Sequence, residues 1–458
     1  MSQNREQWGS KLGFILAASG SAVGIGNIWK YPSIAGQNGG GAFTLVYLAC
    51  ILIVGLSIVI AEFVIGRKTQ LSPVGAFEKL APGTNWKWVG YLGVASAFVI
   101  LSFYGVVGGW ILKYIIDSFS GGFDALAGNP EAAGTMFNGF ITSAWSPVIY
   151  QVLFMMLCIG VIINGVKGGI EKWSRIMMPM IIVLLGVLAV RGMTLPGGME
   201  GLSFLFNPRF EDLTASAIVL ALGHSFFTVS LGMGTMITYG SYLDKKQNLM
   251  TSALWVIFLD TAIAMLAGVA IFTTVFALGA NPAEGPGLIF VVLPTVFAQM
   301  AGGAIWGTMF FILLFMAALT SAISILEVVT AYFIDQKGWS RKKATIQFGA
   351  VITVVGAFCS FSLGGGINIT EFMGMSFFDF MDGLSSKYML PIGGMFTAIF
   401  ILKKWGIPNF IDELKNGMDN FNIPPWLIRT LLTIGATVVA FIIFNEVYAE
   451  IFGKALIG

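Results

Sequence analysis

Gly20-Ser21-Ala22-Val23-Gly24-Ile25-Gly26-Asn27-Ile28-Trp29-Lys30-Tyr31-Pro32 lies inside an apolar run that is long enough to cross a membrane. The stretch nevertheless contains three glycines, an asparagine and a lysine, so its helix is expected to break near mid-membrane. Backbone groups released from a helix cannot face lipid unpaired, and they must meet neighbouring protein, an ion or a substrate. The stretch therefore predicts a binding site.

The composition indicates a polytopic membrane protein in contact with a lipid bilayer. Of 458 residues, 56% are hydrophobic and only 10% are charged, which is far from the average of soluble proteins. The net charge of +2 gives no sign of a nucleic-acid partner. One histidine and three scattered cysteines supply neither a set of metal ligands nor a nucleophile with its base, so the pattern disfavours a membrane enzyme.

Apolar stretches of about 20 residues predict eleven membrane-spanning helices. They cover residues 12–36, 42–66, 88–116, 148–164, 171–192, 213–240, 249–279, 305–334, 343–361, 376–402 and 426–452. Of the 25 lysines and arginines, 19 fall on the face that also carries the N-terminus. Because basic residues concentrate on the cytoplasmic side, we expect a cytoplasmic N-terminus and an external C-terminus.

A second interrupted helix follows five spans after the first. It is Phe226-Phe227-Thr228-Val229-Ser230-Leu231-Gly232-Met233-Gly234, within the span 213–240. Two interrupted spans at equivalent places of two five-helix halves are typical of inverted-repeat secondary transporters. We therefore predict a cytoplasmic segment (1–11), a first repeat (12–192), a second repeat (213–402) and a peripheral helix (426–452). Close helix packing is the alternative interpretation of the glycines.

The ends of broken helices favour charged ligands. The positive N-terminal end of a half-helix attracts a carboxylate, and the negative C-terminal end attracts a cation. The two breaks therefore predict an amphoteric substrate that moves together with a cation.

Several motifs in order give the chain a resemblance to a known family. They are Arg5 to Trp8 with Gly20–Pro32, Asn38-Gly39-Gly40-Gly41-Ala42-Phe43, Phe226-Phe227-Thr228, Thr238-Tyr239-Gly240-Ser241-Tyr242 and Leu319-Thr320-Ser321. The chain resembles, over nearly its whole length, a bacterial member of the neurotransmitter:sodium symporter family. The resemblance implies an all-α leucine-transporter fold with a five-plus-five inverted repeat and unwound helices 1 and 6, in the inner membrane. It also implies sodium-coupled import of an L-amino acid by alternating access. The family's usual twelfth helix is missing, which leaves the oligomeric state open.

The resemblance implies two sodium sites made of oxygen ligands. The first consists of Ala22, Asn27, Thr228 and Asp260, and the second of Gly20, Val23, Ala317, Thr320 and Ser321. Carbonyl, amide and hydroxyl oxygens suit a hard cation beside an unwound backbone. For Thr320 and Ser321 the alternative is ordinary hydrogen bonding to a carbonyl one turn earlier.

Asp260 is the main departure from the family pattern, because many relatives have asparagine there. Ala264, one turn later, stands where chloride-independent relatives often carry an acid. We interpret Asp260 as a sodium ligand that also supplies the fixed negative charge, so that transport needs no chloride. Proton counter-movement and a purely structural role for Asp260 stay open.

The substrate pocket implied by the resemblance holds the carboxylate and the amino group of an α-amino acid. Its residues are Ala22, Ile25, Gly26, Ile100, Tyr104, Phe227, Thr228, Ser230, Met233, Ser321 and Ile325. Met233 replaces an aromatic residue of relatives selective for aliphatic substrates. Because methionine is slender and adaptable, we expect a hydrophobic or aromatic L-amino acid. Ordinary packing is the alternative for any one of the 22 methionines.

The resemblance also implies two gates. The outer gate consists of Lys30, Tyr104, Phe227 and Asp382, with Asp379 as the alternative partner of Lys30; the inner gate consists of Arg5, Trp8, Ser241, Tyr242 and Asp335. Gly169 and Pro179 mark a helix start that is expected to unwind. We interpret Glu62 and Glu327 as carboxylates that support the unwound backbone, with a proton site as the alternative for Glu327.

Other functions fit the pattern less well. A channel needs a continuous polar pore, whereas these polar groups cluster at one midplane locus between two gates. A sensor of the same fold, which binds an amino acid without transporting it, stays open.

Overall fold

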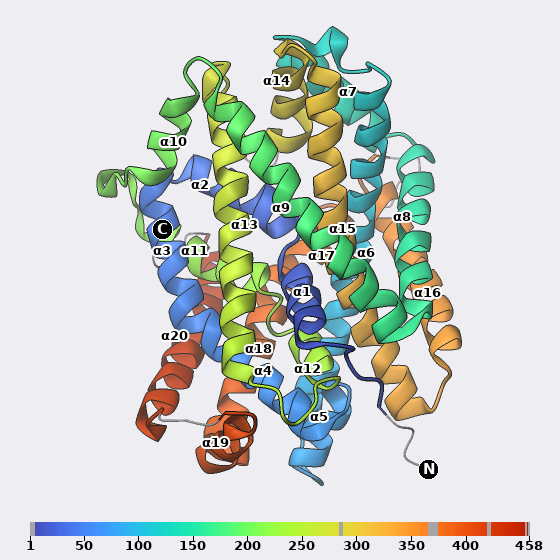
Figure 1. Cartoon of the computed structure of the whole chain (residues 1–458), viewed down its shortest axis with the longest axis vertical. Helices are drawn as coiled ribbons and strands as arrows, with labels where there is room; N and C mark the ends of the chain where they lie inside the picture. Colours follow the sequence, from blue (N-terminus) through green and yellow to red (C-terminus); the bar gives the residue numbers. More distant parts are fainter. Residues whose placement is uncertain (1–4, 284–286, 365–373, 419–422, 454–455, 457–458) are drawn as a thin grey trace.

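The computed structural model describes residues 5–283, 287–364, 374–418, 423–453 and 456, and the regular elements in these ranges are all helices. Residues 1–4 of the predicted cytoplasmic segment lie outside the described residues. Most helices run roughly along the long axis of a single bundle (Figure 1).

Nine helices of the described ranges are long and apolar enough to cross a membrane. They are α3–η2–α4 (Gly41–Thr69), α6 (Lys87–Phe119), α8 (Ser146–Ile163), η4–α9 (Val166–Met193), α13 (Leu249–Ala277), α15 (Gly303–Lys337), α16 (Arg341–Phe361), α17–η7–α18–η8 (Phe377–Trp405) and α20 (Pro425–Phe452). Each overlaps a predicted span. The fifth begins earlier than predicted because the π-helical turn η4 (Val166–Glu171) precedes α9 (Lys172–Met193).

The first predicted span is a bent pair. α1 (Lys11–Ala22) meets the helical stretch Gly26–Gln37, made of η1 (Gly26–Lys30) and α2 (Tyr31–Gln37), at an angle of 51°. The helix ends because Val23 adopts an extended backbone, with ψ of 103°. The bent pair brings the spans of the described ranges to ten.

The sixth predicted span, 213–240, is also interrupted. α11 (Ala215–Thr228) and α12 (Thr235–Gly240) are separated by an irregular segment, 229–234. Ser230, Gly232 and Gly234 have positive φ values there, of 54°, 78° and 77°, a backbone that glycine adopts without steric cost. Because both pieces are short, the total of eleven spans stays a prediction, as do the boundaries of the repeats.

Several of the shorter helices lie toward the two ends of the bundle (Figure 1). One end carries α5 (Pro73–Leu80) and α19 (Ile407–Lys415) near the N-terminal segment, and the other carries α7 (Pro130–Ile141), α10 (Gly198–Phe206) and α14 (Leu293–Gln299). The 3-10 turns η3 (Asp124–Leu126) and η5 (Phe210–Asp212) lie in the loops.

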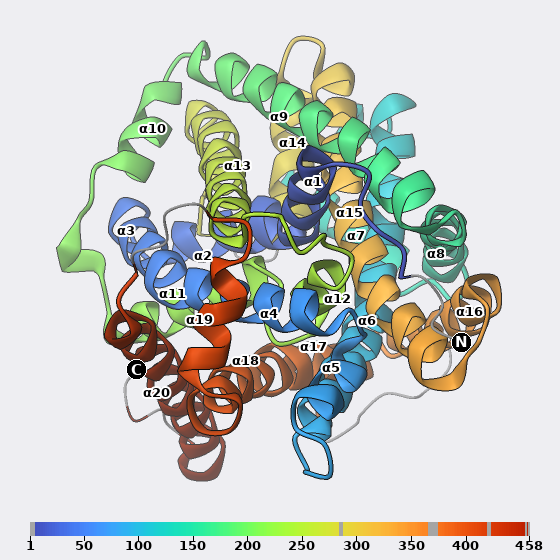
Figure 2. The same cartoon turned by 60° about the horizontal axis from the view of Figure 1, so that its bottom comes forward.

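Burial separates an inner scaffold from a lipid-facing periphery. The most apolar part of α15 is 83% buried and that of α6 is 78% buried, and the two helices pack along each other. The corresponding part of α20 is only 28% buried. α12 lies near the centre of the bundle and α9, α16 and α20 lie at its periphery (Figure 2).

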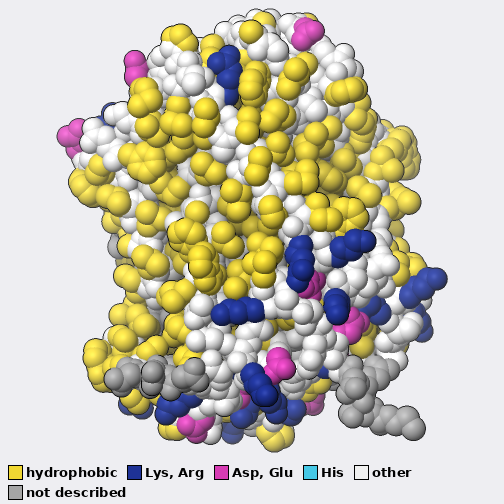
Figure 3. Space-filling model, viewed as in Figure 1, with side chains coloured by type: hydrophobic (Ala, Val, Ile, Leu, Met, Phe, Trp, Pro, Cys, Tyr) yellow, Lys and Arg dark blue, Asp and Glu magenta, His cyan; other side chains and the backbone are white. Residues whose placement is uncertain are grey.

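The surface follows the same division. Hydrophobic side chains cover the middle of the molecule, and most lysines and arginines on the visible face gather toward the end with the N-terminal segment (Figure 3). This distribution matches a membrane belt with a basic end.

Candidate substrate and ion site

The two helix breaks meet at one small pocket with about 300 Å³ of space not occupied by atoms. Its walls come from α1 and the segment that follows it, α6, the break between α11 and α12, and α15. The lining residues are Ser21, Ala22, Gly24, Gly26, Ile100, Tyr104, Phe227, Ser230, Met233, Ser321 and Ile325. Nine of the eleven predicted substrate residues are in this set.

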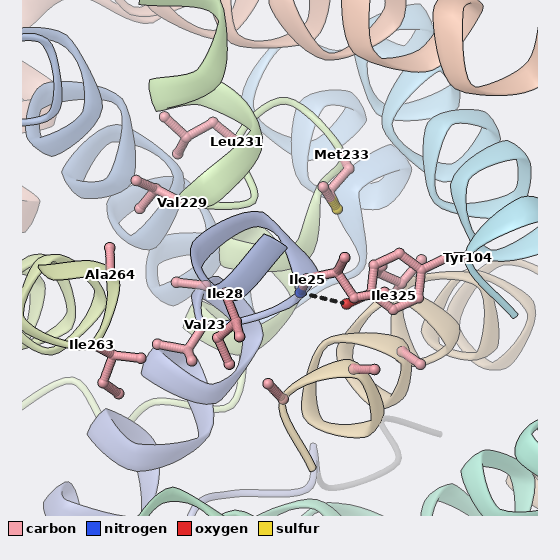
Figure 4. Close-up of a cluster of buried hydrophobic side chains, with 14 of the residues drawn as sticks. Val23, Ile25, Ile28, Tyr104, Val229, Leu231, Met233, Ile263, Ala264 and Ile325 are labelled. Atoms are coloured by element: carbon pink, nitrogen blue, oxygen red, sulfur yellow. Dashed lines mark hydrogen bonds between the residues drawn. The ribbon is translucent and has the colours of Figure 1, made fainter. Parts of the chain in front are cut away.

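The other two predicted residues, Ile25 and Thr228, lie directly behind the pocket wall. The backbone N–H of Ile25 donates a hydrogen bond to the Tyr104 hydroxyl over 3.3 Å, and Thr228 faces Asp260. Met233, Ile325 and Tyr104 lie beside the unwound segment at Ile25 (Figure 4). The pocket wall thus combines apolar side chains with backbone and hydroxyl groups.

Sequence reasoning missed Ser21 and Gly24 as lining residues. Both belong to the quoted stretch, so the signal was present. A methyl group at Gly24 would contact the Ser321 and Tyr104 hydroxyls at less than normal separation, which explains why this wall position carries no side chain.

The residues of the first predicted sodium site lie together beside the pocket. Asn27 Nδ2 donates to Asp260 Oδ1 over 2.8 Å, and Thr228 donates to the same oxygen over 3.3 Å. The Asn27 amide oxygen accepts the N–H of Gly24 over 3.1 Å. Asp260 is fully buried, and its Oδ2 has no hydrogen-bond partner in the described structure. Because a buried carboxylate oxygen needs a partner, the arrangement suits a cation.

An aromatic pair, Tyr47 and His224, supports this cluster from behind. The Tyr47 hydroxyl donates to Thr228 over 3.3 Å, and the His224 ring lies 5.2 Å from the Tyr47 ring, centroid to centroid. His224 is buried and its Nε2 has no hydrogen-bond partner in the described structure. The histidine therefore contributes here chiefly by ring packing.

The residues of the second predicted sodium site meet where α15 crosses the end of α1. Ser321 Oγ lies 3.3 Å from the carbonyl oxygen of Val23 and 3.5 Å from that of Gly20. Thr320 Oγ1 donates to the carbonyl of Ala317 over 3.0 Å, which is the local bond of the alternative interpretation. All five residues are buried.

The Ser21 carbonyl joins the elements of the site. It accepts hydrogen bonds from Ser230 over 2.9 Å and from Ser321 over 3.0 Å. The Ser21 hydroxyl is also 2.7 Å from that of Ser324. The unwound end of α1 is thereby fixed to the second break and to α15.

On the external side predicted from charge, the four residues of the predicted outer gate lie close together. Lys30 Nζ is 3.1 Å from Asp382 Oδ1 and 4.1 Å from the centre of the Phe227 ring. Asp379 instead pairs with Ser376 at the start of α17 (Phe377–Gly383). The pocket is covered on this side by a lysine, an aromatic ring and a carboxylate.

On the opposite side, the predicted inner-gate residues also meet. Arg5 forms an ion pair with Asp335, donates to Ser241 over 2.6 Å and lies over the Tyr242 ring at 4.6 Å. Trp8 Nε1 donates to the Tyr239 carbonyl over 3.0 Å. Residues 5–10, which we call the N-terminal strap, are thus fastened across this end of the bundle.

The two buried glutamates have different surroundings. Glu62 accepts the backbone N–H of Gly232 over 2.8 Å, so it supports the second break as expected. For Glu327 this interpretation is wrong, because it is paired with Arg341 over 2.6 Å and accepts the Tyr242 hydroxyl over 2.5 Å. Glu327 lies beside the inner gate, not beside the unwound backbone.

Two further acids fasten the strap to the start of the fifth span. Glu6 accepts the backbone N–H of Val166 over 2.6 Å. Glu171 accepts the N–H of Gly9 over 2.6 Å and pairs with Arg175 over 2.7 Å. The strap and η4, the turn before the Pro179-containing helix α9, are therefore held by mutual contacts.

A family model and individual relatives place the chain in the same protein family. The family model described as sodium:neurotransmitter symporter family matches residues 5–125 and 141–452. The chain is 41% identical over 416 residues to an uncharacterized sodium-dependent transporter, YhdH, of Bacillus subtilis, covering 91% of each chain. It is 25% identical to the sodium-dependent dopamine transporter of Caenorhabditis elegans, covering 90% of this chain and 76% of that one.

A solved structure shares the fold. The crystal structure of MhsT in complex with L-phenylalanine superposes with a TM-score of 0.88 at 46% identity, covering 96% of this chain and 99% of MhsT. The predicted leucine-transporter fold is therefore confirmed. The chain belongs to the sodium:neurotransmitter symporter family of sodium-dependent membrane transporters.

Proposed function

We propose that this protein imports a hydrophobic or aromatic L-amino acid together with sodium, by alternating access and without a requirement for chloride. The observation that carries the proposal is the buried pocket at the meeting point of both helix breaks, which has one cluster of oxygen atoms on each side of the unwound α1 segment. The proposed cytoplasmic N-terminus and inner-membrane location of a bacterial cell follow from the distribution of basic residues and from the bacterial relative.

The substrate class follows from the two parts of the pocket wall. In our proposal the backbone around Ile25 and Gly26 and the Tyr104 hydroxyl bind the carboxylate, while carbonyls near Thr228 bind the amino group. Ile100, Met233 and Ile325 then surround the side chain. L-Phenylalanine is the ligand named for the MhsT structure, and an aromatic side chain is our first choice here.

The coupling ion is proposed to bind at two sites. At the first, Asp260, Asn27, Thr228 and the Ala22 carbonyl would contact sodium, and the substrate carboxylate would complete the shell. Substrate and sodium must then raise each other's affinity by the same factor. At the second site, sodium would be bound by the carbonyls of Gly20, Val23 and Ala317 and the hydroxyls of Thr320 and Ser321.

Independence from chloride rests on Asp260. Its carboxylate is fully buried next to the first proposed sodium site, and only one of its two oxygens is hydrogen-bonded in the described structure. An ionised Asp260 carboxylate at this place would balance the cation without a mobile anion.

The test is uptake of labelled amino acids into proteoliposomes. We expect L-phenylalanine uptake that needs an inward sodium gradient and is unchanged when gluconate replaces chloride. Loss of uptake in gluconate would refute the role of Asp260. Sodium-dependent binding without any uptake would instead favour the sensor, and uptake of small or polar amino acids alone would refute the substrate class.

A further inference from the structure

A second pocket, open to the surface, lies between the N-terminal strap and the start of the fifth span. It has about 940 Å³ of open space and is lined by Gly9, Lys167, Glu171, Lys172, Arg175 and Ile176. It lies on the outside of the bundle, and none of its residues lines the substrate pocket.

The charges in this pocket do not balance. Glu171 is already shared between the strap and Arg175, as its contacts with Gly9 and Arg175 show. Lys167 and Lys172 are exposed and form no ion pair within the part of the chain that the structure describes. Two cations therefore point to a ligand that carries negative charge.

An apolar stripe leads from the pocket along α9. Trp173, Ile176, Met180 and Val183 follow one another at helical spacing and are 42%, 44%, 44% and 63% exposed. Ile176 is also part of the pocket wall, so the stripe begins where the cations are. Figure 3 shows basic side chains around an acidic one over the lower end of α9, directly below the hydrophobic belt.

Cations next to an exposed apolar helix face at the edge of a membrane belt match the chemistry of a phospholipid. We propose that this pocket binds the anionic headgroup of a membrane phospholipid, with Lys167 and Lys172 contacting the phosphate and the acyl chains lying along Ile176, Met180 and Val183. Basic pockets of this kind at the cytoplasmic interface attract anionic lipids, whereas a zwitterionic headgroup brings its own compensating cation.

The site also bears on the strap. The headgroup would lie against Gly9, whose N–H is held by Glu171, and against η4, whose Val166 N–H is held by Glu6. A lipid that contacts both segments binds best when they are docked. By linkage, the anionic lipid stabilises the docked strap and thus the closed inner side of the bundle. This consequence does not depend on which substrate the protein carries.

Native mass spectrometry of the purified full-length protein tests the site, with phosphatidylglycerol and phosphatidylcholine of identical acyl chains as probes. We expect wild type to retain phosphatidylglycerol more strongly than phosphatidylcholine. Each basic residue next to an anionic headgroup contributes about fivefold to binding, so Lys167→Gln with Lys172→Gln should weaken phosphatidylglycerol binding about 25-fold. Phosphatidylcholine binding should not change.

The matched control is Lys245→Gln with Lys246→Gln, which removes two neighbouring exposed lysines outside the pocket and should leave lipid binding as in wild type. Lys167→Arg with Lys172→Arg keeps both charges and should retain phosphatidylglycerol. Equal binding of the two lipids by wild type would overturn the proposal, and so would wild-type phosphatidylglycerol binding by the double glutamine variant. If that variant does not fold, loss of bound phosphatidylglycerol from wild type with rising salt supports the site, and retention at high salt refutes it.

Hydrogen exchange in nanodiscs tests the effect on the strap. Peptides that cover residues 5–10 and 166–171 should exchange more slowly in phosphatidylglycerol than in phosphatidylcholine for wild type. In the double glutamine variant the difference should disappear. Faster exchange of the wild-type strap in phosphatidylglycerol would refute the linkage.

Discussion

Replacement of Asp260 by asparagine isolates the charge at the first proposed sodium site. Asparagine has the same shape, and its amide oxygen can still accept from Asn27 and Thr228, which now contact Asp260 Oδ1 over 2.8 and 3.3 Å. The amide nitrogen would take the place of Oδ2, which has no hydrogen-bond partner in the described structure. The variant therefore keeps the packing and removes one anionic ligand.

The expected magnitude follows from the burial of the group. Two unit charges about 4 Å apart interact by about 4 kcal/mol at an effective dielectric constant of about 20. The amide dipole of asparagine recovers part of this interaction energy. We therefore expect the binding free energy of sodium to weaken by about 2 kcal/mol or more, which is about a 30-fold loss of affinity. Substrate affinity at fixed low sodium should fall with it, since the two ligands share the site.

Sodium titration of amino-acid binding measures this change. Scintillation proximity binding of labelled L-phenylalanine to purified protein, with gluconate as the anion, gives the half-saturating sodium concentration. Asp244→Asn is the control, because Asp244 is an exposed loop carboxylate that caps the backbone of Lys246. A half-saturating sodium concentration that stays within threefold of wild type in Asp260→Asn would show that the carboxylate is structural.

Three further substitutions test the gates and the pocket. Lys30→Gln removes a partly exposed ion pair with Asp382 and a contact with the Phe227 ring. Bound substrate should therefore dissociate about tenfold faster in stopped-flow measurements. An unchanged dissociation rate would contradict the role of Lys30 in an outer gate. Arg341→Gln leaves the buried Glu327 carboxylate without its cation and should cost about 3–5 kcal/mol of stability, seen as a lower unfolding temperature in detergent, whereas exposed Lys342→Gln should not. Met233→Phe adds bulk to the pocket, so it should weaken the binding of free tryptophan by about 1–3 kcal/mol and that of free alanine much less. Equal losses of affinity for the amino acids Trp, Tyr, Phe, Leu and Ala would show that Met233 does not set the size limit of the substrate.

The sequence predicted the position of most helices because lipid imposes a simple rule on apolar length. The two breaks could also be predicted, since several glycines and polar residues close together in such a run weaken the helix and cannot face lipid. The number of spans was harder to predict: α11 and α12 are short pieces on either side of a break, and neither meets the length of a full crossing on its own.

Contacts between distant segments were the harder part of the site. Nothing in the chain order says that Glu327 pairs with Arg341 beside the inner gate and not with unwound backbone. The same holds for the strap, where Glu6 and Glu171 hold backbone N–H groups more than 150 residues away along the chain. Hydrogen bonds from side chains to backbone leave no residue pattern, because every residue except proline offers the same N–H.

Ser21 explains why the ion clusters and the pocket should act as one unit. Its carbonyl accepts from Ser230 and from Ser321, and its hydroxyl meets that of Ser324. The eight positions from Gly20 to Asn27 include residues of the first proposed sodium site, of the second and of the pocket wall. A ligand that orders any part of this segment lowers the entropic cost of ordering its remaining residues. Sodium and substrate can therefore raise each other's affinity without a larger rearrangement of this segment. In the alternating access that we propose, the bond from Ser230 to the Ser21 carbonyl lets the two broken spans move together, whereas their movement relative to α15 must break the contacts of Ser21 with Ser321 and Ser324.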